Sequence, residues 1–170
     1  MKQSILATLI VLATASLAAA QTVFVVRHAE RADAAGSGAA PRQEMMMASD
    51  PELSAAGRAR AEALASMLKD AGVTAIFATE YKRTQQTAAP LAKLLGITLQ
   101  SVPSKDTAAL VGRVKSAKGD VLVVGHSNTV PEIVKALGID IPITVGEADY
   151  DNLFVVTLGP KPALLRLHFR

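Results

Sequence analysis

The chain has 170 residues, half of them hydrophobic, which is enough apolar material for the core of one domain. It contains 18 Lys and Arg against 15 Asp and Glu, and the resulting net charge of +3 is too small to indicate a nucleic-acid-binding surface. The absence of cysteine excludes disulfides and thiolate metal sites.

The N-terminal segment has the composition of a secretory signal. Lys2 supplies a positive charge, residues 5–17 are almost entirely apolar, and three alanines follow at 18–20. The apolar run is shorter than the ~20 residues that a membrane-spanning helix needs, so we expect cleavage after the alanines rather than a retained anchor. The sequence therefore predicts a signal peptide over residues 1–20, one domain over residues 21–170, no stable membrane anchor after cleavage, and export, to the periplasm in a bacterial cell.

Strands and helices are predicted to alternate along the rest of the chain. The β-branched apolar run at 22–26 is typical of a strand buried on both faces. Residues 27–51 are polar and rich in Gly and Ala, which predicts a long loop. Capping residues, glycines and hydrophobic periodicity place the remaining elements. They are, in chain order, a helix at 54–70, a strand at 75–78, a helix at 83–95, a strand at 97–102, a helix at 106–117, a strand at 120–124, a helix at 130–137, and strands at 152–158 and 163–169.

This alternation predicts an α/β fold, a three-layer α/β/α sandwich with a mostly parallel central sheet. The last two strands are joined by a turn at Gly159-Pro160 and can form an antiparallel hairpin at one edge. Ligands of such sheets bind beyond the carboxyl ends of the parallel strands. Residues that directly follow the strands are therefore the first candidates for a functional site.

Polar segments follow three of the predicted strands directly. Arg27-His28-Ala29-Glu30-Arg31 follows the first, residues 79–84 with Arg83 follow the second, and residues 125–129 with His126 follow the fourth. Arginine forks bind phosphate oxygens bidentately, and a helix start adds backbone N–H groups and a positive dipole end. A neutral imidazole can attack phosphorus to form a phosphohistidine that water later hydrolyses. These residue types favour a phosphoryl-transfer site without a metal ion.

Four motifs together resemble the histidine phosphatase superfamily, which includes the cofactor-dependent phosphoglycerate mutases. They occur in the family's order and cover most of the domain: Arg27-His28-Ala29-Glu30, Leu53-Ser54-Ala55-Ala56-Gly57, Arg83-Thr84-Gln85-Gln86-Thr87-Ala88 and Gly125-His126-Ser127. The resemblance implies that His28 is the nucleophile that accepts the phosphate. It also implies that Arg27, Arg83 and His126, with Ser127, bind the phosphate, and that the protein is a phosphoric monoester hydrolase that acts on a small phosphorylated substrate without a cofactor.

The proton donor to the leaving group is less well defined. The resemblance places an acidic residue after the strand that follows the arginine-bearing helix, and Asp106 is our choice there. No motif fixes it, and Glu30, Glu80 and Glu132 remain open. The segment between Arg83 and His126 has no insertion that could form the lid that a mutase needs to exclude water, which favours hydrolysis.

Two other functions remain open at this stage. The length resembles the small phosphatases of the family that act on phosphohistidine in proteins, although a secretory signal favours a phosphomonoester or an envelope phosphate. A non-catalytic protein that binds phosphorylated ligands would use the same pocket. The third histidine, His168, lies in an alternating terminal strand and is predicted to be structural.

Overall fold

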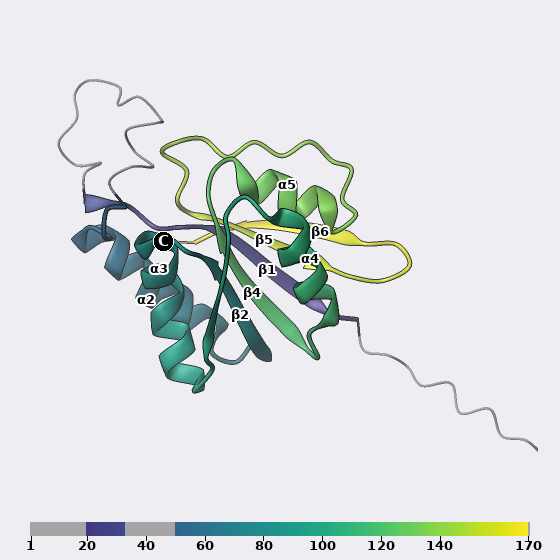
Figure 1. Ribbon diagram of the computed structural model, residues 1–170, viewed down its shortest axis with the longest axis horizontal. Coiled ribbons are helices and arrows are strands. Elements are labelled where there is room, and N and C mark those ends of the chain that lie inside the picture. The colour runs from purple at the N-terminus through teal and green to yellow at the C-terminus, as the bar shows by residue number, and fades with distance from the viewer. Residues whose placement is uncertain (1–19, 33–49, 170) are drawn as a thin grey trace, which may run out of the picture.

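The computed structural model describes residues 20–32 and 50–169 (Figure 1). Nearly all of the predicted signal peptide, and residues 33–49 of the predicted loop, lie outside these described residues. Within these described ranges, ten helices and strands alternate much as the sequence predicts. They are β1 (Thr22–Arg27), α2 (Ala55–Leu68), β2 (Val73–Thr79), α3 (Lys82–Leu95), β3 (Leu99–Val102), α4 (Thr107–Ser116), β4 (Asp120–Gly125), α5 (Thr129–Ala136), β5 (Asn152–Thr157) and β6 (Ala163–His168).

One six-stranded sheet organises the fold, with the strand order β3-β2-β4-β1-β5-β6. The first four of these strands are parallel to one another. β5 pairs antiparallel with β1, and β6 pairs antiparallel with β5. The predicted mostly parallel sheet with an antiparallel hairpin at one edge is therefore confirmed.

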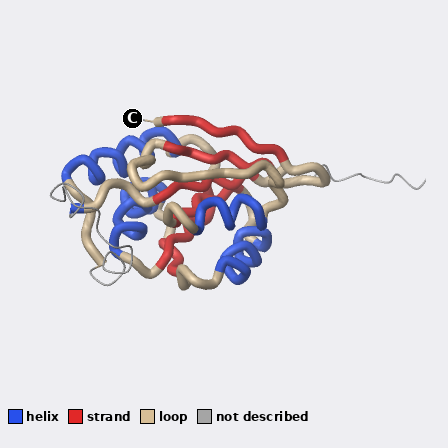
Figure 2. The backbone as a smooth tube through the Cα atoms, turned by 90° about the horizontal axis from the view of Figure 1, so that it is seen from above, coloured by secondary structure: helices blue, strands red, loops and turns tan. Residues whose placement is uncertain are grey.

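Helices cover both faces of the sheet (Figures 1 and 2). On one face, Leu64 of α2 and Leu91 of α3 pack against Ile76 and other residues of the sheet. On the opposite face, Val114 of α4 and Ile133 of α5 lie in a second apolar cluster. The central strands are buried on both sides, which explains why β1 and β4 are continuous apolar runs rather than alternating ones.

The helix ends follow from local chemistry. The Ser54 hydroxyl caps α2 by accepting a hydrogen bond from the Gly57 N–H at 3.0 Å. Gly96 ends α3 in the left-handed conformation with φ of 67°, and the Ile97 N–H then donates to the Ala92 carbonyl at 2.9 Å. This cap occupies Ile97, so β3 begins at Leu99 instead of at the predicted residue 97.

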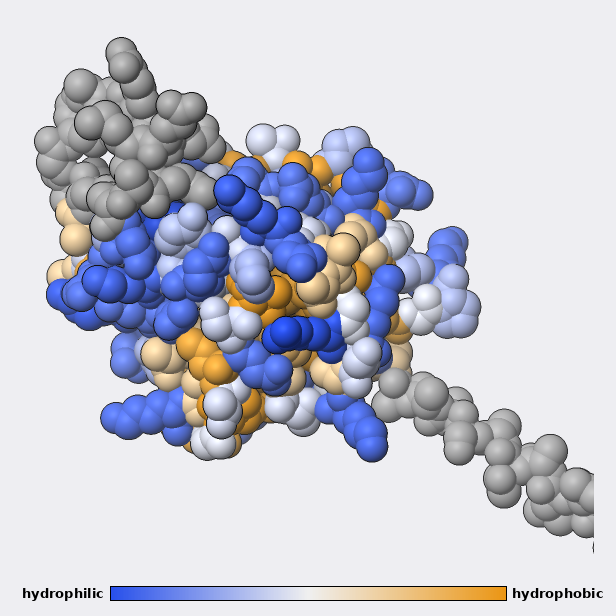
Figure 3. Space-filling view, viewed as in Figure 1, coloured by the Kyte–Doolittle hydropathy of each residue, from blue (hydrophilic) through white to orange (hydrophobic). Residues whose placement is uncertain are grey.

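The outer surface is mostly hydrophilic on the face drawn in Figure 3, with apolar residues exposed between the charged ones. None of the helices in the described part of the chain is long and apolar enough to cross a membrane.

Candidate active site

The predicted site residues converge because β1, β4 and β2 are adjacent in the sheet. Arg27 is the last residue of β1 and pairs in register with Gly125, the last residue of β4. Thr79 ends β2 on the other side of β4. The residues that follow these strands, His28 and His126, therefore emerge at the same edge of the sheet, and their ring centroids lie 5.4 Å apart.

His28 is buried and oriented by the backbone. Its Nδ1 atom lies 2.8 Å from the carbonyl oxygen of Ala29. A carbonyl only accepts hydrogen bonds, so Nδ1 carries the proton and Nε2 of the neutral ring keeps its lone pair. The Ala29 N–H in turn donates to the Thr87 hydroxyl at 2.9 Å. The backbone that fixes the His28 ring is thus tied to α3.

Burial controls the protonation of His28. Loss of solvent is the largest effect, and the nearby Arg27, His126 and Arg83 add to it, so that the pKa of His28 falls to about 2 despite the hydrogen bond to Ala29. The imidazole is therefore neutral near pH 7. A neutral ring with a free Nε2 is the form of histidine that acts as a nucleophile.

His126 is held by a chain of polar side chains. Its Nδ1 lies 3.5 Å from Arg83 Nη2, and because arginine only donates, Nε2 carries the ring proton. Nε2 lies 2.9 Å from the Thr79 hydroxyl, which lies 2.9 Å from the Thr84 hydroxyl. Thr84 donates onward to the Tyr81 carbonyl at 2.7 Å. Burial first, and then Arg83 and Arg27, lower the pKa of His126 to about 3.

Arg27 lies between β1 and the loop that joins α5 to β5. Its Nη1 donates to the Gly146 carbonyl at 2.6 Å, and its Nη2 contacts the Glu147 carboxylate at 3.2 Å. The ring of Tyr150 lies 4.3 Å from the guanidinium carbon. The Nε atom of Arg27 is buried and has no hydrogen-bond partner among the described residues. Ser127 joins the same group, since its hydroxyl donates to Glu147 at 2.8 Å.

Arg83 has a similar environment, with an aromatic ring and a carboxylate beside its guanidinium. Its guanidinium is buried, lies 4.4 Å from the Tyr81 ring, and has Nη1 3.8 Å from an Asp50 carboxylate oxygen. The two arginines and the two histidines thus surround one region at the ends of β1, β2 and β4. Two guanidiniums beside two neutral imidazoles can bind a phosphate dianion and leave one ring free to attack it.

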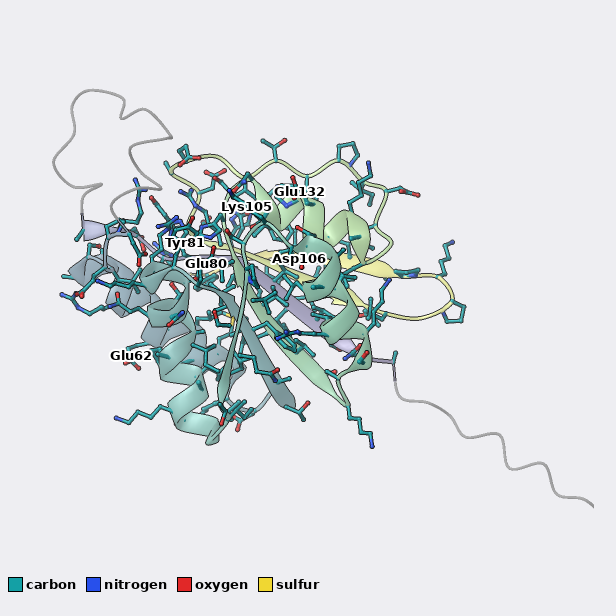
Figure 4. The ribbon with its side chains drawn as sticks, viewed as in Figure 1. Glu62, Glu80, Tyr81, Lys105, Asp106 and Glu132 are labelled. Atoms are coloured by element: carbon teal, nitrogen blue, oxygen red, sulfur yellow. The ribbon has the colours of Figure 1, made fainter. Side chains whose placement is uncertain are left out.

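The candidate proton donors each have a partner elsewhere. Asp106 caps α4 through a hydrogen bond from the Ala109 N–H at 2.9 Å, and Glu132 lies on α5 near Thr107 (Figure 4). Glu80 accepts hydrogen bonds from Ser104 at 2.7 and 2.9 Å.

Glu30 is also engaged, since Arg60 binds its carboxylate through Nε and Nη2. Burial is the largest single effect on the pKa of Glu30 and raises it, but the hydrogen bonds and charge of Arg60, a backbone hydrogen bond and the charge of Arg27 together outweigh burial and lower that pKa. Glu30 is thereby kept ionised, and none of the contacts described for these four carboxylates reaches His28 or His126.

Glu147 has no signal in the sequence, because it comes from an irregular loop with no motif, and Tyr150 lies in the same loop. Thr79, Tyr81 and Thr84 belong to the polar segment 79–84 that follows the second predicted strand, but no pattern indicates their individual roles. The third histidine, His168, is exposed on β6, and its Nδ1 lies 3.1 Å from the Asp151 carboxylate.

The chain resembles known proteins both in sequence and in fold. The model of the histidine phosphatase superfamily (branch 1) matches residues 23–106. The structure of the protein histidine phosphatase SixA complexed with tungstate is 19% identical, with a TM-score of 0.62 over 86% of this chain and 96% of that one. A mycobacterial glucosyl-3-phosphoglycerate phosphatase complexed with VO3 is 15% identical, with a TM-score of 0.65 over 84% of this chain and 96% of that one.

A third structure, mycobacterial hydrolase 1, is 16% identical, with a TM-score of 0.64 over 86% of this chain and 97% of that one. No curated protein matches the sequence significantly. At these identities the structural likeness establishes the fold.

Proposed function

The chain belongs to the histidine phosphatase superfamily, and we propose that it is a phosphatase that hydrolyses small phosphomonoesters through a phosphohistidine on His28. The observation that carries the proposal is the tautomer of His28. The Ala29 carbonyl holds the Nδ1 proton, and burial keeps the ring neutral, so Nε2 is a free nucleophile beside two guanidiniums. Solved neighbours described as phosphatases support the same chemistry.

The reaction has two steps in this proposal. His28 Nε2 attacks phosphorus, an N–P bond forms, and the bond from phosphorus to the leaving oxygen breaks, with that oxygen taking a proton from solvent. Water then attacks phosphorus, the N–P bond breaks with its electron pair returning to Nε2, and one proton of the attacking water returns to solvent while the other stays on the released phosphate. Arg27 and Arg83 stabilise the charge on the equatorial oxygens in both steps. His126 contributes through Nδ1, which becomes a donor when the bound dianion raises its proton affinity.

Export belongs to the proposal as well. It is supported by the composition of residues 1–20 and by the absence of cysteine, which leaves nothing to mispair in an oxidising compartment. The substrate would then be a phosphorylated small molecule or a phosphate group of the cell envelope.

A second candidate function is hydrolysis of phosphohistidine on a protein. The specific observation in its favour is that Asp106, Glu30, Glu80 and Glu132 all make hydrogen bonds elsewhere. The group that leaves when the P–N bond of a phosphohistidine breaks is an imidazole, a better leaving group than an alkoxide, so its departure depends less on an acid supplied by the enzyme. A preference for phosphoramidates over phosphate esters would favour this candidate.

The test is metal-free hydrolysis of p-nitrophenyl phosphate by the purified domain and by His28→Ala. We expect His28→Ala to lower kcat by about 10³-fold or more, because it removes the imidazole that attacks phosphorus. His168→Ala is the matched control, since it removes the exposed histidine of β6 and should leave kcat within about twofold. Equal turnover by wild type and His28→Ala would contradict the proposal.

A further inference from the structure

Each arginine of the pocket meets a carboxylate at the protein surface. The Arg27 side chain is 3% exposed, whereas the Glu147 side chain that contacts it is 61% exposed. Glu147 also accepts the hydrogen bond of Ser127, the residue predicted to help bind phosphate. Its carboxylate therefore lies between the solvent and two phosphate-binding groups.

The second arginine repeats this arrangement with a residue from another part of the chain. Arg83 is 3% exposed, and the Asp50 side chain 3.8 Å from its Nη1 is 36% exposed. Asp50 is held in place by the Lys82 N–H, which donates to it at 2.9 Å. Two segments far apart in sequence thus each place a negative charge next to a buried guanidinium.

The backbone beside Glu147 is anchored even though its side chain is exposed. The Gly146 carbonyl accepts from Arg27, and the Gly146 N–H donates to Asp149 at 2.9 Å. Tyr150 lies against the Arg27 guanidinium. An entering phosphate can therefore displace the Glu147 carboxylate from Arg27 and Ser127 while the loop keeps that carboxylate close to the site.

We propose that Glu147 and Asp50 form an acidic rim that selects phosphate esters with a neutral or cationic organic group and disfavours those with a second anionic group beside the phosphate. The inference rests on the proposed function, because it assigns the phosphate to the two arginines and leaves the organic group at the rim. Two like charges about 6 Å apart change a binding constant by roughly threefold when fully solvated and by roughly a hundredfold near a protein surface. The rim therefore affects selectivity more than it affects the chemical step.

Two substrates of the same length test this directly. Phosphoethanolamine and phosphoglycolate both have two carbons, but the first carries an ammonium group and the second a carboxylate. We expect wild type to prefer phosphoethanolamine in kcat/KM by about tenfold or more, and the preference to shrink at high salt as the charges are screened. Glu147→Gln should raise kcat/KM for phosphoglycolate and lower it for phosphoethanolamine, and adding Asp50→Asn should extend both changes.

Asp140→Asn is the matched control, because it removes one exposed negative charge from the same loop between α5 and β5. It should leave the preference unchanged. Hydrolysis of p-nitrophenyl phosphate by each variant reports that the pocket is assembled. Failure of wild type to hydrolyse it would contradict the proposed function itself.

Two results would overturn the acidic rim while leaving the phosphatase intact. In the first, Glu147→Gln and the double variant keep the wild-type preference. In the second, Glu147→Gln raises kcat/KM for both substrates alike, which would make Glu147 only a competitor for Arg27.

Discussion

Two arginine–glutamate pairs in this protein have the same chemistry and different roles. Arg60 of α2 binds Glu30 through Nε and Nη2, and the two side chains are 21% and 20% exposed. Arg60 also donates to the Phe169 carbonyl at 3.0 Å, so the pair ties α2 to both ends of the described domain. Arg27 is more deeply buried, yet its partner Glu147 is exposed and makes one contact to it at 3.2 Å.

The difference shows where the fold keeps charge available for a ligand. In the Arg60 pair the carboxylate satisfies the guanidinium with good geometry, which is how a structural ion pair is built. In the Arg27 pair the guanidinium is immobilised by a backbone carbonyl and an aromatic ring, and the carboxylate is the replaceable part. A buried cation with a loosely held anion is what a phosphate-binding site requires.

Removing each of the two arginines in turn should give the largest difference between the two pairs. Arg27→Ala should lower kcat/KM for p-nitrophenyl phosphate by about 10²–10³-fold, because it removes a guanidinium that stabilises the charge developing in the transition state. Arg60→Ala should keep most of the activity and lose about 1–3 kcal/mol of stability, since it leaves Glu30 partly buried without its partner. Steady-state kinetics and urea unfolding measure both quantities. An activity loss in Arg60→Ala as large as in Arg27→Ala would show that the two pairs do not differ in role.

Two glycines in different helices test how closely α2 packs against Glu30, the partner of Arg60. Gly57 lies in the first turn of α2, where an added Cβ would overlap the Glu30 carbonyl oxygen, whereas Gly112 in α4 has open space at that position. Gly57→Ala should therefore destabilise the protein by about 1–3 kcal/mol. Gly112→Ala should be neutral or stabilising by about 0.5–1 kcal/mol, because alanine favours a helix. Thermal or urea unfolding of the two variants would refute the close approach of α2 to Glu30 if both behaved alike.

Acid should destabilise the two-histidine site and the Arg60–Glu30 pair in different pH ranges. The pKa values of His28 and His126 fall from 6.5 to about 2 and about 3, so the unfolded chain binds protons that the folded chain does not. Their contribution to stability is complete above pH 6.5 and is lost as the pH falls, by up to about 1.4 kcal/mol per pH unit for each ring. Glu30, whose pKa is lowered from 4.5, loses its contribution only below pH 4.5.

Unfolding between pH 6.5 and pH 4.5 separates these contributions. His126→Gln should reduce the slope of stability against pH in this range, and Glu30→Gln should leave the slope unchanged. A slope unaffected by His126→Gln would mean that the imidazole is not held neutral by the pocket.

The smallest effect concerns the hydroxyl that orients His126. Thr79→Val removes the acceptor of the Nε2 proton and should lower kcat/KM by about tenfold while shifting the pH profile of kcat, because the ring is no longer held in one tautomer. Thr79→Ser keeps the hydroxyl and should restore both values. If Thr79→Ser were as impaired as Thr79→Val, packing of the threonine methyl group would matter more than the hydrogen bond.

Much of the fold could be predicted because local signals agreed with the tertiary structure. Continuous apolar runs indicated β1 and β4, and Ser54 and Gly96 indicated helix ends. The alternation of strands and helices predicted a mostly parallel sheet. The boundary of β3 could not be predicted, because the cap after Gly96 uses backbone hydrogen bonds that leave no trace in composition.

The site was predictable only where residues follow strands. Arg27 ends β1, and His28 and His126 come directly after β1 and β4, so the geometry of a parallel sheet brings them together. Glu147 is different, because its position depends on the path of an irregular loop and on three-dimensional contacts to Arg27 and Ser127. The proton donor was predicted from a resemblance alone, and the contacts of Asp106 to the start of α4 give that choice no support.

Direct detection of the intermediate tests the central claim most closely. Wild type would be mixed with phosphate-labelled p-nitrophenyl phosphate, quenched in alkaline denaturant within the first turnovers, and separated from free label. The account predicts label on the protein that is stable in alkali, is lost in mild acid, and is absent from His28→Ala but present in His168→Ala. Turnover by wild type with no protein-bound label under any quench, or label that persists in His28→Ala, would contradict it.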